Sequence, residues 1–229
     1  MMISQASVIT APQPLLATLA KRGWSPHLAE GAEAYTIDSE IARIGDLLGT
    51  RTAGRAGALE EIIRPQAAED AHPQSLSARY GLSALPFHTE LSHRLRPCRY
   101  LLLGCIDPGT PSAATMLLDW RTLGLSPDEL RLLEGAPILV RTGRRSFYST
   151  ILSPDRAFFR YDPGCLEAVD NRGQAALALV EHRLACAAPQ IHHWHRGNIL
   201  IIDNWRVLHG RRPSDQGSGR RLARVLIDA

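Results

Sequence analysis

The segment Pro86-Phe87-His88-Thr89-Glu90 contains the residue types most directly suited to metal chemistry. Its composition indicates a strand, and residues two apart on a strand point to the same side, so His88 and Glu90 are expected to project together. Far along the chain, an apolar strand followed by a polar turn presents a second histidine, His209. Two histidines and one carboxylate form the facial triad that binds non-haem Fe(II) and leaves positions open for substrates. The sequence therefore predicts an iron site at these three residues.

The elements that must position these ligands are predicted to be short strands joined by turns. Apolar residues at helical spacing, with capping residues, glycine or proline at the ends, favour helices. Apolar runs between turn residues favour strands. We expect helices over residues 12–22, 39–48, 126–135 and 174–186, and strands over residues 86–90, 99–106, 138–141, 147–152, 157–162, 191–194, 199–203 and 222–227. This pattern predicts a mainly β protein, a sandwich or barrel with flanking helices.

Length and composition place the chain among ordinary globular proteins. With 229 residues, of which 45% are hydrophobic and 21% charged, it is expected to form one domain with a sizeable core. Its four cysteines show no paired C-x-x-C spacing, so neither a structural zinc site nor a disulfide framework is predicted. No apolar segment approaches the roughly 20 residues that a membrane span requires. We therefore expect a soluble cytoplasmic protein.

The charge pattern argues against a nucleic-acid partner. The net charge is only +3 and Lys21 is the single lysine, whereas a nucleic-acid surface usually carries a stronger basic excess. Arginines near the C-terminal end are either a solvated face or carboxylate clamps, since a guanidinium matches a carboxylate with two hydrogen bonds. These residues are Arg206, Arg211, Arg212, Arg220, Arg221 and Arg224.

A second group of histidines, His192, His193 and His195, offers a rival metal site. Strand alternation separates His192 from the other two side chains. We therefore interpret this group as structural.

Four features follow one another in a fixed order along the chain. They are Phe87-His88-Thr89-Glu90, Thr115, the segment from Asp203 to Arg211 that contains His209, and Arg220-Arg221-Leu222-Ala223-Arg224. Together they resemble the Fe(II)- and 2-oxoglutarate-dependent dioxygenases of the taurine dioxygenase (TauD/TfdA) and clavaminate synthase type. The resemblance covers most of residues 76–229, and more loosely the N-terminal helices.

The resemblance implies a double-stranded β-helix, or jelly roll, of the clavaminate synthase-like kind. A single dioxygenase domain would span residues 1–229, with residues 1–64 as a helical flank and residues 65–229 as a jelly-roll core with a helical insert. It also implies Fe(II) bound by the three ligands, 2-oxoglutarate as cosubstrate, and O₂. Thr115 and Arg220 would bind the carboxylates of 2-oxoglutarate.

Glutamate rather than aspartate in the second ligand position resembles the branch of the family that acts on amino acids. The resemblance therefore implies a small, polar, amino-acid-like substrate that is hydroxylated, desaturated or cyclised at an aliphatic carbon. Arg224 would bind a substrate carboxylate. Arg160 and Asp162, two apart on a predicted strand, would bind a zwitterion. The sequence leaves open whether the chain forms a homo-oligomer.

Two alternatives use part of the same pattern. A zinc hydrolase could use the three ligands to acidify a bound water, but it leaves Arg220 and Thr115 without a role. A non-catalytic jelly-roll binding protein could use the C-terminal arginines for an anionic partner. It leaves His88, Glu90 and His209 without a role.

Overall fold

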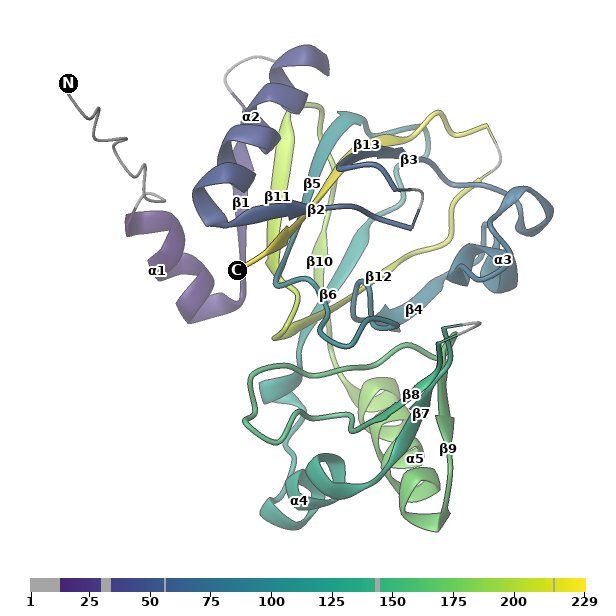
Figure 1. Ribbon diagram of the computed structural model, residues 1–229. Coiled ribbons are helices and arrows are strands. Elements are labelled where there is room, and N and C mark those ends of the chain that lie inside the picture. Colours follow the sequence, from purple (N-terminus) through teal and green to yellow (C-terminus); the bar gives the residue numbers. More distant parts are fainter. Residues whose placement is uncertain (1–12, 30–33, 56, 143–144, 216) are drawn as a thin grey trace, which may run out of the picture.

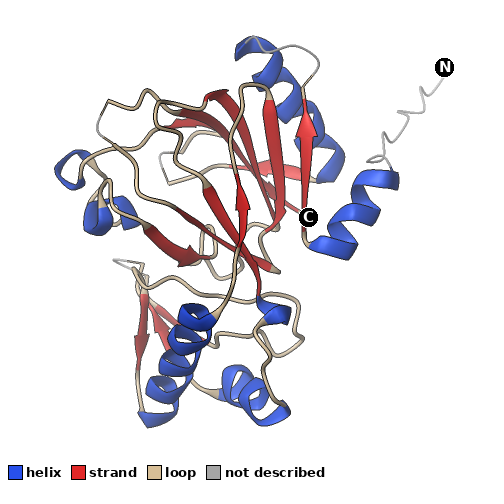
Figure 2. Ribbon diagram, turned by 180° about the vertical axis from the view of Figure 1, so that it is seen from behind, coloured by secondary structure: helices blue, strands red, loops and turns tan. Residues whose placement is uncertain are grey.

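Two antiparallel sheets packed face to face form the body of the protein, with a smaller helical and β insert on one side (Figures 1 and 2). The computed structural model describes residues 13–29, 34–55, 57–142, 145–215 and 217–229. Within these ranges, no helix has both the length and the apolar character needed to cross a membrane. The mainly β fold with flanking helices agrees with the jelly roll expected from the sequence.

The larger sheet has six strands in the order β1-β11-β5-β13-β2, and β3 also pairs with β13. The strand bounds are β1 Trp24–Leu28, β2 Thr50–Thr52, β3 Glu60–Ile63, β5 Tyr100–Asp107, β11 Asn198–Asp203 and β13 Arg221–Asp228. The three central strands, β5, β11 and β13, are largely buried because both faces of the sheet are covered. That explains the continuous apolar runs of β5 and β11.

The smaller sheet has four strands in the order β10-β6-β12-β4. The strand bounds are β4 Leu85–His88, β6 Thr115–Asp119, β10 Gln190–His192 and β12 Val207–Arg211. Leu117 and Val207 of this sheet pack with Leu103 and Ile202 of the larger sheet in one apolar core. The two sheets are therefore joined by interdigitating side chains, as in other sandwiches.

Helices cover the outer face of the larger sheet. Helix α1 is Gln13–Arg22 and α2 is Ala34–Leu48. The apolar stripe of α2, which includes Ile37 and Ile41, packs on β5, β11 and β13. At Gly104 of β5 the helix lies so close that an added Cβ would be 2.6 Å from Ile37 Cγ2. This close approach requires glycine at that position.

The insert packs against the outer side of the smaller sheet, below it in Figure 1. It contains helices α4 Pro127–Gly135 and α5 Asn171–Cys186, and a small sheet of β7 Ile138–Val140, β8 Phe147–Ser149 and β9 Leu166–Ala168. Ser126 and Glu129 form the reciprocal capping box that begins α4, as the sequence predicts. The remaining helical elements are η1 Ala68–Asp70, α3 Leu76–Tyr80 and η2 Trp120–Thr122.

Several boundaries differ from the sequence-based expectations. Residues 157–162 form no strand beyond a single bridge between Leu152 and Phe159, because their backbone bonds to scattered segments instead. Helix α2 begins at Ala34 rather than residue 39, and α1 begins at Gln13, the preceding residue 12 lying outside the described ranges. The segment expected to be a helical flank also supplies three strands, β1, β2 and β3.

We expect Gly104→Ala to destabilise the fold, because the added methyl group would push α2 away from β5. Overpacking of this kind costs about 1–3 kcal/mol. The measurement is the free energy of unfolding in urea. Ile37→Ala should be destabilising alone, but less so in the Gly104→Ala background. Strict additivity of the two changes would contradict the proposed contact.

Candidate metal centre

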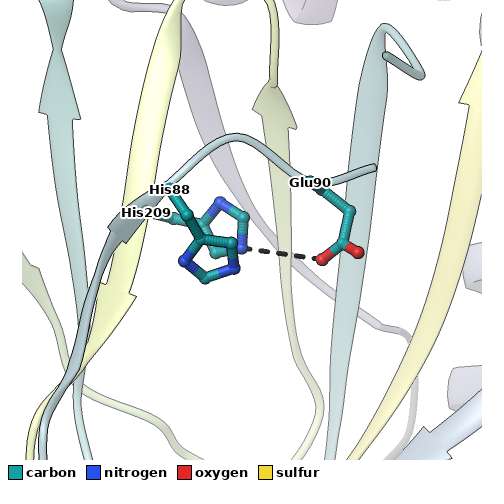
Figure 3. A group of neighbouring side chains, drawn as sticks. All are labelled: His88, Glu90 and His209. Atoms are coloured by element: carbon teal, nitrogen blue, oxygen red, sulfur yellow. Dashed lines mark ion pairs between the residues drawn. The ribbon is translucent and has the colours of Figure 1, made fainter. Parts of the chain in front are cut away.

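The pairing of β4 with β12 brings the two predicted histidine ligands together. His88 and His209 are direct register partners across the two strands. Their ring centroids are 4.2 Å apart, and the rings are tilted by 48°. Figure 3 shows both imidazoles facing the Glu90 carboxylate, with His209 Nε2 3.8 Å from Glu90 Oε2. One ligand atom from each of the three residues lies within 4.8 Å of the others, so the three can converge on one ion.

Glu90 reaches the site from a turn rather than from a strand. Strand β4 ends at His88, and Leu91 has a positive φ of 54°. The side chain of Asn204 fixes this turn: its Oδ1 accepts a bond from Glu90 N at 2.7 Å and its Nδ2 donates to Glu90 O at 3.0 Å. Asn204 is 1% exposed. The expected convergence of His88 and Glu90 is thus present, but a buried asparagine produces it instead of strand alternation.

The surroundings of the two histidines suit metal binding. His88 Nδ1 lies 3.0 Å from Pro86 O, and because a carbonyl can only accept, Nδ1 is the donor and Nε2 is the nitrogen that remains for a metal ion. Burial, together with neighbouring His88, lowers the pKa of His209 to about 3. His209 is therefore neutral near pH 7.

Glu90 is ionised although it is almost enclosed. Burial alone would raise its pKa, but the charge of Arg224 opposes burial and holds the pKa of the Glu90 carboxyl below its ordinary value. Arg224 Nη1 lies 3.3 Å from Glu90 Oε2. Two imidazoles and one carboxylate in this arrangement are the donor set of the 2-His-1-carboxylate iron site.

The three ligands line a cavity of about 740 Å³. A volume of this size suits a small organic ligand. Thr115 and Arg220, the residues expected to bind the cosubstrate, line the same cavity. Arg224 and Asp162 line it as well, whereas Arg160 does not. The structure thus brings seven of the eight predicted site residues to one cavity.

Arg220 is buried without a carboxylate partner. It is 6% exposed, it makes no hydrogen bond or ion pair with the described residues, and its Nε is an unsatisfied buried donor. Burial and the neighbouring Arg211 lower its pKa to about 10, so it still carries its charge. A buried cation without a partner is costly. An anionic ligand in the cavity would supply that partner.

Thr115 and Arg211 lie opposite one another on β6 and β12. Thr115 Oγ1 accepts a bond from Trp194 Nε1 at 3.0 Å, which leaves its hydroxyl hydrogen free to donate into the cavity. Arg211 Nη2 donates to Gly81 O at 2.7 Å and to Ser83 O at 2.8 Å. Arg211 therefore anchors the segment before β4 while adding a second positive charge beside Arg220.

Arg160 was expected to contact the substrate, and the structure corrects this. Its side chain is 0% exposed and donates to the backbone oxygens of Ser92, Arg94 and Leu95. Arg160 thus fixes the loop that follows Glu90. Because residues 157–162 form no regular strand, Arg160 and Asp162 do not share a face.

The rival histidine group has no metal geometry. Burial lowers the pKa of His192 to about 4, with smaller effects of His193 and His195, and its ring stacks edge-on against Trp194. Within the described ranges, His88, Glu90 and His209 are the one group of three histidine, cysteine or acidic residues close enough to hold an ion. The structural interpretation of the second group therefore stands.

Three residues at the site have roles that the sequence did not reveal. Asn204 and Arg211 flank His209 within the third sequence feature, yet no pattern marks them as anchors for distant backbone. Glu61 of β3 contacts Arg224, and a carboxylate on a short polar strand gives no signal of that contact. All three roles depend on pairing between segments far apart in the sequence.

Comparison with known proteins supports the resemblance. The profile of the family described as "Taurine catabolism dioxygenase TauD, TfdA family" matches residues 125–226. This range includes His209, Arg220 and Arg224 and ends within β13.

Solved structures share the fold over most of this chain. An asparagine oxygenase in complex with Fe(II), 2S,3S-3-hydroxyasparagine and succinate has a TM-score of 0.75 and 19% identity, over 93% of this chain and 77% of that one. The non-haem iron oxygenase OrfP, in complex with Fe, succinate and (3S)-hydroxy-L-Arg, has a TM-score of 0.76 and 18% identity, over 95% and 81% of the two chains. OrfP in complex with Fe and alpha-ketoglutaric acid has a TM-score of 0.75 and 19% identity, over 94% and 78%. At such low identity, the likeness establishes the shared fold.

We expect His88→Ala and His209→Ala to remove binding of Co(II), used in place of Fe(II), because each substitution deletes a direct ligand. The loss should exceed the roughly 10- to 100-fold that follows removal of an outer-shell partner. Visible absorption of Co(II) during titration of the apoprotein measures it. His193→Ala, which alters an exposed histidine of the second group, is the control and should bind normally. Equal loss in the control would place the ion elsewhere.

Proposed function

We propose that this chain, which carries the TauD, TfdA family profile over residues 125–226, is an Fe(II)- and 2-oxoglutarate-dependent oxygenase. Its substrate is a small, polar, amino-acid-like molecule that is hydroxylated, or else desaturated or cyclised, at an aliphatic carbon. The observation that carries the proposal is the occurrence of a facial triad and an unpartnered buried arginine in one cavity.

His88, Glu90 and His209 would hold the iron, and the oriented ring of His88 and the ionised Glu90 fit a divalent ion. When bound, iron with 2-oxoglutarate and O₂ supplies the oxidising power for an unactivated C–H bond, with release of succinate and CO₂. The protein's own contribution is to keep three ligands fixed and to enclose the reacting groups. Asn204 and Arg160 serve this purpose by fixing the backbone of Glu90 and of the loop that follows it.

The cosubstrate binds where Arg220 and Thr115 meet the cavity. A dicarboxylate requires a fixed cation at its far end, and the guanidinium of Arg220 offers a bidentate fork in a partly dry environment. The free hydroxyl hydrogen of Thr115 adds a donor. Arg211 strengthens the positive potential there without giving up its bonds to the backbone.

The substrate end of the cavity offers charges of both signs. Asp162 Oδ1 accepts a bond from Gly164 N at 2.7 Å, and the carboxylate lines the cavity, where it suits a substrate ammonium group. Arg64, exposed at the cavity wall, has no partner among the described residues and suits a substrate carboxylate. The amino acids named in the complexes of the similar structures, hydroxyasparagine and hydroxyarginine, support a substrate of the amino-acid class.

The zinc hydrolase alternative explains the three ligands equally well. It gives no reason for a buried Arg220 without a partner, or for a second buried arginine beside it. The oxygenase proposal accounts for both through a dicarboxylate cosubstrate. We therefore favour the oxygenase.

Anaerobic addition of Fe(II) and 2-oxoglutarate should produce the weak visible charge-transfer band of their chelate. Arg220→Ala should raise the 2-oxoglutarate concentration needed for this band, because a carboxylate loses its partner in a partly buried site. Such a loss costs roughly 2–5 kcal/mol, which is about 30-fold or more in affinity.

Arg221→Ala is the matched control for this titration. Arg221 neighbours Arg220, but its side chain is 43% exposed and lies 3.8 Å from Asp107. The control should leave 2-oxoglutarate affinity unchanged. Absence of any band in the wild-type protein, with ester or amide hydrolysis by its zinc form, would favour the hydrolase.

Amino acids and their simple derivatives should trigger succinate release, because a bound substrate accelerates turnover even when oxidation is incomplete. A screen of such compounds under air measures this. For a substrate that bears an ammonium group, Asp162→Asn should raise KM more than it lowers kcat. Asp215→Asn, which changes an exposed carboxylate outside the cavity, should do neither. Release by fatty acyl chains or sulfonates alone would refute the amino-acid assignment while retaining the oxygenase.

A further inference from the structure

The guanidinium edge of Arg224 that carries Nε and Nη2 is not available to a ligand in the cavity. Its Nε lies 3.1 Å from Glu61 Oε2, and its Nη2 donates to the same oxygen. Only Nη1 faces Glu90. The guanidinium edge that would bind a substrate carboxylate in a bidentate manner is therefore already occupied, contrary to the role expected for Arg224 from the sequence.

The backbone and the packing both fix this contact. Glu61 of β3 and Arg224 of β13 are direct cross-strand partners. The side chains of Glu61, Arg224 and Glu90 are 14%, 19% and 15% exposed, so all three charges lie largely out of water. The Glu61 carboxylate also packs on Gly54, where an added Cβ would be 2.6 Å from Oε2. Glu61 thus has little freedom to move away from Arg224.

The geometry holds Arg224 close to Glu61 and slightly apart from Glu90. A charge-assisted hydrogen bond is normally about 2.7–2.9 Å long, and the 3.3 Å between Nη1 and Glu90 Oε2 exceeds that range. The same Oε2 is the oxygen that faces His209 Nε2 across the metal position. Arg224 and a bound metal ion are therefore two cations that compete for one carboxylate oxygen.

We propose that Glu61 is a positioning residue for the metal centre: by binding the edge of Arg224, it prevents this arginine from neutralising Glu90 and so maintains the affinity for the metal ion. With Glu61 present, one positive charge is shared by two carboxylates, and the group keeps the net charge of a single carboxylate. Without it, Arg224 and Glu90 would form a neutral pair, and the metal ion would have to displace the arginine. This inference rests on the metal site of the proposed function but not on its cosubstrate or substrate.

The test is the Co(II) affinity of the apoprotein, measured by visible absorption without 2-oxoglutarate or substrate. Glu61→Gln keeps the size of the side chain but removes its charge, and it should weaken Co(II) binding by about 10- to 100-fold. Arg224→Gln should bind Co(II) at least as well as the wild-type protein, because the competing cation is gone. The double variant Glu61→Gln/Arg224→Gln should recover affinity to within a few-fold of wild type.

Glu60→Gln is the matched control, because Glu60 neighbours Glu61 on β3 and pairs with Arg51 at 2.6 Å but does not line the cavity. It should leave Co(II) affinity unchanged. If Glu61 merely holds β3 against β13, the double variant will bind worse than either single variant, and the proposal fails. Unchanged affinity in Glu61→Gln also overturns it. Absence of Co(II) binding by the wild-type protein would overturn the metal site itself.

Discussion

The register between β4 and β12 is the interaction on which the rest of the site depends. It sets His88 opposite His209, so a shift of one residue would turn one imidazole to the other face of the sheet. The same strands carry Pro86, whose carbonyl orients His88, and Arg211, which anchors the backbone ahead of β4. Strand pairing therefore determines which two histidines meet, how the His88 ring is oriented and where the segment before β4 lies.

The charges around this pair form a balanced group in a largely dry environment. Glu90 stays ionised because the charge of Arg224 offsets the cost of its burial. Arg220 has no such compensation within the described residues, and it lines the same cavity. The part of the cavity at Glu90 thus suits a cation, and the part at Arg220 suits an anion. The proposed binding of a metal ion beside a dicarboxylate requires such a separation of charge.

Local sequence patterns predicted the elements better than the contacts between them. The capping box at Ser126 and the apolar run of β5 are local signals, and both elements form as expected. Arg160 shows the limit: alternation suggested a cavity-facing side chain, but its guanidinium binds three carbonyls of a loop far away in sequence. The contact between Glu61 and Arg224 likewise arises from strand pairing, which no local pattern encodes.

The position of β13 has a consequence for the order of folding. This strand lies between β5 and the short strands β2 and β3, although it follows all of them along the chain. Pairing over such separations requires closure of long loops, which slows folding. Because Arg224 belongs to β13 and Arg220 immediately precedes it, an intermediate with β13 undocked would have its histidine pair but lack both arginines at the cavity. A metal ion and a dicarboxylate would then bind tightly together only after β13 has docked. Their binding could not stabilise the earlier folding intermediates.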